Sequence, residues 1–161
     1  MKTLPNTIKE EVNMKGLWRF TVREGNSGKV KSQTEYLENL IVTVGKTQLA
    51  KAISGNIGAV TDIKIQYQAL GDDNTAPNAG DTTLGNETTR KIISSLGYSG
   101  GQTNVTAFFA VGEATGTHLE FGVFMAGTIA PNSGVMMNHI LINVTVGAGD
   151  SLTVDGTITF T

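Results

Sequence analysis

Apolar and polar residues alternate with a period of two over three segments in the second half of the chain, 103–112, 135–146 and 151–160. Successive side chains of a strand point to opposite faces of its sheet, so this pattern predicts strands that bury one face and expose the other. The apolar side chains expected on the buried faces are Val105, Ala107, Phe109 and Val111, then Met136, Ile140, Ile142, Val144 and Val146, then Leu152, Val154, Ile158 and Phe160.

The rest of the chain predicts further strands and one helix. The additional strands are expected at 17–22, 30–37, 62–70, 90–97 and 118–125. The helix is expected at 43–54, with Thr43 as its N-cap, Gly55 as its end signal and an apolar face of Leu49, Ala52 and Ile53. About eight short strands with one helix predict a mainly β fold, an antiparallel β-sandwich of jelly-roll-like form with one short α-helix.

The length and composition bound the class of protein. The 161 residues suit one domain, expected at 15–161, and the polar residues 1–14 are expected to form an N-terminal arm. The chain has no cysteine, which excludes disulfides and thiolate chemistry. A net charge of −2 gives no bulk attraction to nucleic acid. The sequence has neither a long apolar run nor an apolar signal-peptide core, so no membrane insertion is expected.

The charged residues are unevenly distributed. No lysine or arginine follows Lys91, and that stretch holds only four acidic residues, Glu113, Glu120, Asp150 and Asp155. Interface cores are depleted in charge, so one interpretation is that neighbouring subunits cover much of this surface. The other interpretation is a neutral, threonine-rich surface that faces solvent.

A long polar loop follows the strand expected at 62–70 and ends near Leu84. Loops of this length inside a compact domain are usually functional, and here we expect a surface that contacts other subunits. Leu84 is the only large apolar residue between Leu70 and Ile92, so we expect it to hold the loop against the domain. The other candidate contact residues of the loop are Asp72, Asp73, Asn74, Pro77 and Asp81. Its acidic residues fit either a Ca²⁺ site or Asx turns.

Charged residues near this loop are candidates for ion pairs. Glu87 and Arg90 are three residues apart, a spacing that allows a local pair. Glu120 lies among apolar residues of the strand expected at 118–125 and therefore needs a partner, for which Arg90 is the candidate. We expect Glu87 or Glu120 to pair with Arg90 and to fix the end of the loop.

Several short motifs around this loop resemble those of a known family. They are Ala-Leu-Gly at 69–71, Thr-Ala-Pro at 75–77, Asp-Thr-x-Leu at 81–84, Glu-x-x-Arg at 87–90 and Leu-Glu-Phe-Gly-Val-Phe at 119–124. Their order resembles a segment of small structural proteins of tailed bacteriophages, especially tail-fibre, baseplate and fibre-adaptor components. The residues Asn39-Leu40-Ile41-Val42, followed by Gly45, are similar to the segment that precedes this loop in the same family.

The resemblance implies a non-enzymatic virion protein that is made in the cytoplasm of a bacterial host. Its expected partners are copies of itself and other virion proteins, with no cofactor. The main alternative within this class is a capsid decoration or head-fibre protein. An alternative of a different class is a carbohydrate-binding module for a host-surface glycan. Trp18, Phe108, Phe124, Met125, Met136 and Met137 could line a groove for it, but most of them fit the core faces of strands and form no cluster of exposed aromatic residues.

Signals for catalysis are weak in this sequence. Gly45-Lys46-Thr47 imitates the end of a phosphate-binding loop, but bulky residues precede it where that motif requires a glycine. No serine occupies a Gly-x-Ser-x-Gly elbow. His118 and His139 are isolated in the sequence, and both are interpreted as hydrogen-bonded structural histidines.

Overall fold

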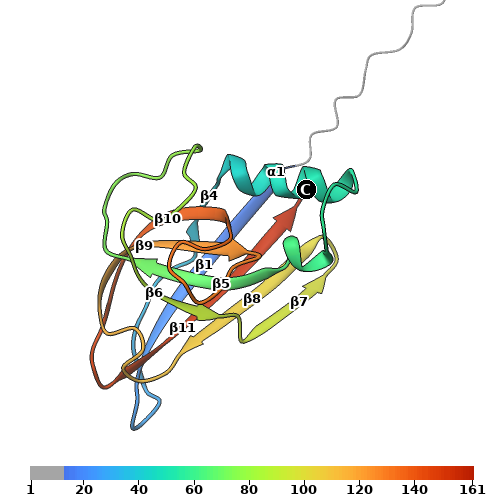
Figure 1. The fold of residues 1–161 in the computed structure, drawn as a ribbon. Coiled ribbons are helices and arrows are strands. Elements are labelled where there is room, and N and C mark those ends of the chain that lie inside the picture. The colour runs from blue at the N-terminus through green and yellow to red at the C-terminus, as the bar shows by residue number, and fades with distance from the viewer. Residues whose placement is uncertain (1–12) are drawn as a thin grey trace, which may run out of the picture.

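The computed structural model describes residues 13–161, which form two antiparallel sheets that pack face to face (Figure 1). The first sheet has the strand order β2 (Val30–Gln33), β1 (Met14–Glu24), β11 (Asp150–Phe160), β8 (Gln102–Phe109) and β7 (Ser95–Ser99), and β3 (Leu37–Glu38) also pairs with β1. The second has the order β4 (Leu40–Ile41), β10 (Val135–Val146), β9 (Gly116–Met125), β5 (Ile65–Gly71) and β6 (Glu87–Ile92). The predicted β-sandwich is confirmed.

The main core lies between the two sheets, where the alternating residues of the long strands meet. The rings of Trp18 and Phe20 on β1 both contact Phe121 on β9, with ring centroids 5.0 and 5.1 Å apart. Opposite Trp18 on β11 lies Gly156, and a Cβ there would come within 2.1 Å of the indole. Glycine is therefore required at this position for the indole to lie against its neighbouring strand.

A second, smaller apolar cluster lies on the outer face of the second sheet. It consists of Val42, Ala69, Leu84, Phe124 and Met136. The prediction that Met136 shares a face with Ile140 and the later residues of β10 is wrong, because the register with β9 shifts between Met136 and Asn138. Such a bulge inserts one residue and reverses the alternation, so Met137 enters the main core and Met136 packs outside it.

The strand expected at 90–97 is in fact two strands in different sheets. Ile93 still donates its backbone N–H to Gln66 of β5, whereas the next residue, Ser94, donates to Thr106 of β8. The chain therefore passes from the second sheet to the first within two residues. A continuous apolar and polar pattern does not reveal such a switch, because both strands keep the same period.

Two other strand boundaries also differ from the prediction. The segment expected at 30–37 is divided into β2 and β3, because the hydroxyl of Thr34 accepts the backbone N–H of Phe20 in place of a ladder bond. The segment expected at 62–70 begins with a 3₁₀ turn, η1 (Val60–Asp62). The carboxylate of Asp62 accepts the N–H groups of Gly58 and Ala59, at 2.8 and 2.9 Å, and so holds this turn.

The helix α1 (Thr43–Ile53) confirms the predicted helix, although its N-cap is Val42 and Thr43 is its first residue. It contacts β10 at its first turns, where Gly45 is buried. The predicted apolar face is only partly correct, because Leu49 is half-buried and Ile53 is 90% exposed.

No helix among the described residues is long and apolar enough to cross a membrane. Of the expected arm, 1–12 lie outside the described residues, and Met14 already belongs to β1.

Candidate functional site

The loop between β5 and β6, residues 72–86, returns over the outer face of the second sheet, and we call it the covering loop. In Figure 1 it lies at the left of the molecule, beside β9 and β10. Leu84 is almost fully buried in the outer apolar cluster, as the sequence predicted. Two backbone hydrogen bonds hold the loop. The N–H of Asp72 donates to the carbonyl of Asn86 at its base, and the N–H of Thr43 in α1 donates to the carbonyl of Ala79 near its middle.

Three ionisable side chains join the covering loop to the sheet. Glu120 on β9 and His139 on β10 are 1% and 4% exposed, and Asp81 belongs to the loop. His139 Nδ1 lies 2.7 Å from Asp81 Oδ2, and His139 Nε2 lies 3.1 Å from Glu120 Oε2. Ionised carboxylates only accept hydrogen bonds, so both ring nitrogens donate and the geometry fits a charged imidazolium.

Glu120 also accepts two backbone hydrogen bonds from the end of the covering loop. The N–H groups of Gly85 and Asn86 donate to its two carboxylate oxygens at 2.9 and 2.7 Å. The carboxylate fits beside β5 because residue 71 is glycine, where a Cβ would come within 2.3 Å of Glu120 Oε1. A buried charge requires partners, and these contacts supply them to Glu120 without an arginine.

The environment shifts the pKa values of the two buried groups in opposite directions. Burial favours neutral forms and is the largest single effect on each. For His139, hydrogen bonds to Glu120 and Asp81 outweigh burial and raise its pKa above the ordinary 6.5. For Glu120, the hydrogen bonds from His139, Asn86 and Gly85 outweigh burial and lower its pKa below the ordinary 4.5. Both groups are therefore charged in weakly acidic solution.

A second buried ion pair lies where the covering loop leads into β6. The side chains of Glu87 and Arg90 are 1% and 2% exposed, and Arg90 Nη2 donates to Glu87 Oε2 at 2.8 Å. Arg90 Nη1 donates to Thr128 O and to the hydroxyl of Ser133, at 2.8 and 2.9 Å. The guanidinium also lies over the rings of Tyr67 and Phe124. These contacts connect the end of the loop to the turn between β9 and β10.

The structure decides between the two predicted partners of Arg90. Glu87 is the partner, and the prediction that Glu120 pairs with Arg90 is wrong, because Glu120 bonds to His139 instead. His139 was predicted to be an isolated structural histidine and not a member of this site. Only the cross-strand neighbourhood of β9 and β10 brings the histidine to the carboxylate, and no sequence spacing contains that information.

The remaining predicted residues of the covering loop lie near its surface and form local turns. Asp73 accepts the backbone N–H of Thr75 at 2.9 Å, as an Asx turn requires, and Asp72 accepts from the side chain of Asn86. Asn74 is exposed and Pro77 is half-buried. Within residues 13–161 the structure places no three histidine, aspartate or glutamate side chains in a metal-binding arrangement. Asx turns therefore account for the contacts of Asp73.

The structure also shows the surroundings of His139 and of the residues that were considered for a groove and assigned mostly to the core. Both nitrogens of His139 are bonded to carboxylates, so this histidine has no free nitrogen with which to activate a nucleophile. Trp18, Phe124, Met125, Met136 and Met137 are buried in the two apolar clusters and do not line a groove, whereas Phe108 is exposed. The contacts hold the covering loop on the sheet and leave its middle facing solvent.

Comparisons with protein-family models, with curated proteins and with solved structures find no match to this chain.

The buried ion pair predicts unequal effects for two neighbouring substitutions. Arg90→Ala leaves the carboxylate of Glu87 buried without its partner, so we expect the free energy of unfolding to fall by about 3–5 kcal/mol. Lys91→Ala removes a pair with Glu113 whose side chains are 29% and 41% exposed, so we expect a loss below about 1 kcal/mol. Urea unfolding of both variants measures the difference, and equal losses would contradict the role given to Arg90.

The shifted pKa of His139 predicts a specific pH dependence of stability. Because folding raises this pKa, the stabilisation is complete below 6.5 and is lost as the pH rises through the higher folded value. Because folding lowers the pKa of Glu120, its stabilisation is complete above 4.5 and is lost as the pH falls through the lower folded value. The free energy of unfolding lost in His139→Gln should therefore be largest between pH 4.5 and 6.5 and smaller at higher pH.

Urea unfolding across this pH range checks the prediction, and His118→Gln provides the control because His118 bonds to Thr88 and Ala114 and contacts neither carboxylate. The control leaves the contacts of His139 with Asp81 and Glu120 in place, so it should not reproduce the loss that His139→Gln causes. A constant difference between the unchanged protein and His139→Gln at every pH would show that the imidazolium does not hold the loop.

Proposed function

We propose that this protein is a structural component of a tailed phage or phage-like particle, a tail-fibre, baseplate or adaptor protein that acts through protein–protein assembly. The observation that carries the proposal is the strand β7 at the edge of the first sheet. The resemblance of the motifs at 69–90 and 119–124 to phage structural proteins supports the choice of particle.

All five residues of β7 are exposed, and none of them is charged. Among the described residues β7 pairs only with β8, so its other edge presents unpaired backbone N–H and C=O groups. Monomeric proteins usually protect such an edge with lysine, proline or a bulge. An exposed, uncharged edge of five residues that lacks lysine and proline is suited to pairing with a strand of another subunit.

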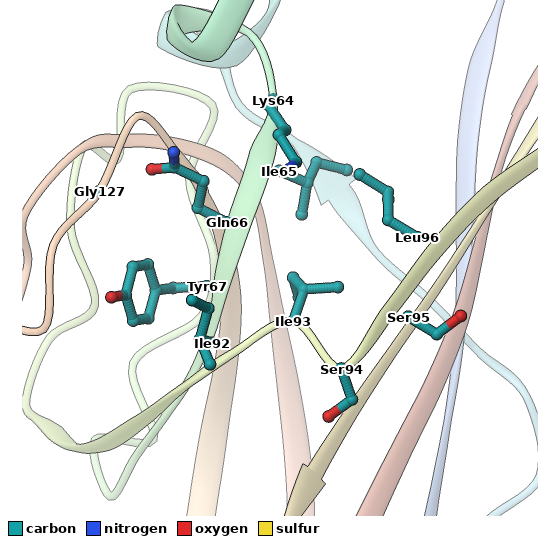
Figure 2. A pocket seen from close by; sticks show the side chains of 10 residues that line it. All are labelled: Lys64, Ile65, Gln66, Tyr67, Ile92, Ile93, Ser94, Ser95, Leu96 and Gly127. Atoms are coloured by element: carbon teal, nitrogen blue, oxygen red, sulfur yellow. The ribbon is translucent and has the colours of Figure 1, made fainter.

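Large apolar side chains lie on and beside this edge. Tyr98 is 88% exposed, and Leu96 and Ile92 are also exposed. Behind β7 a cavity of about 420 Å³ opens between the two sheets, where the chain crosses from β6 to β7. Figure 2 shows Ile65 and Leu96 pointing toward each other across this gap, with Ile93 beside them. An apolar side chain of a partner could fill the cavity while its backbone extends the sheet.

The absence of basic residues after Lys91 now has a structural meaning. Strands β7 to β11 all follow this residue. In the first sheet, the three neighbouring strands β11, β8 and β7 therefore carry no lysine or arginine. Contacts between copies therefore involve little charge repulsion and little desolvation of charge. The held covering loop adds an ordered polar surface that loses little conformational entropy on binding.

Two exposed leucines allow a matched test of this proposal. Leu96 on the edge strand β7 and Leu141 on the interior strand β10 are both 39% exposed. Lysine at position 96 places a charge in the expected contact, so Leu96→Lys should weaken self-association, measured by sedimentation velocity, by about tenfold or more. Leu141→Lys should leave it within about twofold, and circular dichroism of both variants controls for folding.

Incorporation into particles tests the function directly. Particles purified from a lysate should contain the unchanged protein and Leu141→Lys at similar copy number, measured by mass spectrometry, and should contain much less Leu96→Lys. The proposal is wrong if the unchanged protein is monomeric at high concentration and absent from particles. Its choice of surface is wrong if both leucine variants enter particles equally.

A further inference from the structure

A separate apolar groove lies at the end of the sandwich beneath α1, about 610 Å³ in volume, and we call it the helix groove. Its lining residues are Asn13, Met14, Lys46, Leu49, Ala50, Ala52, Ile53, Ile63 and Phe160. A smaller adjoining cavity shares Leu49, Ile63 and Phe160 with it and extends to Met125, Met137 and Ile158 in the direction of the core. The groove is thus an outward continuation of the space between the two sheets.

The walls of the helix groove expose an unusual amount of apolar surface. Ile53 at the end of α1 is 90% exposed, and Phe160 at the end of β11 is also exposed. Contact of such surface with water is unfavourable, and concave apolar surfaces of this kind commonly bind a chain segment or ligand. We propose that residues 1–12 of the same chain bind in the helix groove.

The chain itself leads into the groove. Asn13 exchanges two backbone hydrogen bonds with Thr161, at 2.6 and 2.9 Å, so the start of the described chain is fixed beside the end of β11. Asn13 and Met14 are both lining residues, and in Figure 1 α1 lies next to the carboxyl terminus. The residue before Asn13 therefore begins at the wall of the groove, which gives the segment a high effective concentration there.

The sequence of the segment fits an apolar groove of this length. Leu4, Ile8 and Val12 follow one another at intervals of four residues, the spacing that places side chains on one side of a helix. Proline is accepted in the first turn of a helix, so Pro5 allows a helix over 5–12, and these eight residues would span about 12 Å against about 16 Å for the eleven residues of α1. The three apolar residues can therefore lie along α1 while the polar residues face solvent.

Two glutamates of the segment can also meet the lysines of α1. Lys46 is the charged member of the described groove lining, and Lys51 lies further along α1. Between Ile8 and Val12 the segment carries Lys9, Glu10 and Glu11. These carboxylates would lie near the lysines of α1 when the apolar residues face the groove. Ile53 and Phe160 would then be covered without a partner protein.

Engineered cysteines provide a clean test, because the chain contains none of its own. Ile8→Cys together with Ile53→Cys places one thiol in the segment and one at the exposed wall of the groove. We expect the double variant to form an intramolecular disulfide under mild oxidation, detected as faster migration of the monomer in a non-reducing gel. The initial rate of this reaction reports how often the segment occupies the groove.

Two adjacent substitutions in this double variant serve as test and control. Leu4→Asp adds a charge to the apolar side of the segment and should slow disulfide formation about tenfold. Thr3→Asp adds the same charge one residue away and should change the rate less than about twofold. Both positions lie in the segment and outside the described residues, so circular dichroism of both variants should show the same β-sheet content.

Two results would overturn the proposal. Equal rates in the Leu4→Asp and Thr3→Asp forms would show that the segment reaches the engineered thiol on α1 by random collision only. A disulfide that joins two chains, with a rate that rises with protein concentration, would show that the segment of another copy occupies the groove. The lining of the helix groove contains no residue of β7, and the proposal does not depend on a virion role, because particle incorporation of Leu96→Lys is a different measurement.

Discussion

The buried carboxylate of Glu120 determines how the outer face of the second sheet is covered. A charge at 1% exposure among apolar strand residues is costly unless hydrogen bonds replace its water. His139 on the neighbouring strand supplies one partner, and the backbone of Gly85 and Asn86 supplies two more. The covering loop must therefore return to this point of the sheet. Leu84 then enters the apolar cluster directly beside it, so charge and apolar burial favour the same loop position.

The covering loop has a fixed base and an exposed segment. The base of the covering loop is fixed by the Asp81–His139–Glu120 cluster and by the Glu87–Arg90 pair, while residues 74–76 remain exposed. A partner that binds an ordered loop has less conformational entropy to remove. The two charge clusters are buried, so they resist salt screening better than surface pairs do. The edge strand β7 belongs to the other sheet, and its five exposed residues carry no charge.

Patterns that repeat along the chain predicted the fold well, and contacts between distant segments were harder to predict. The alternation at 151–160 and the end signal Gly55 indicated β11 and the end of α1, since both depend on local sequence. The isolated apolar character of Leu84 correctly indicated its burial. The sheet switch at Ile93–Ser94 and the bulge near Met136 leave the local pattern almost unchanged, so sequence did not reveal them. The choice of His139 over Arg90 as partner of Glu120 depends on strand order, which periodicity does not specify.

Amide hydrogen exchange at Gly85 and Asn86 tests the central claim most directly. Both residues are exposed, yet their N–H groups donate to Glu120, so NMR should show exchange slower than that of free amides by about a hundredfold. In Glu120→Gln the charge that attracts both donors is absent, and their protection should fall while that of the amides in β11 persists. Exchange of Gly85 and Asn86 at the unprotected rate in the unchanged protein would contradict the account.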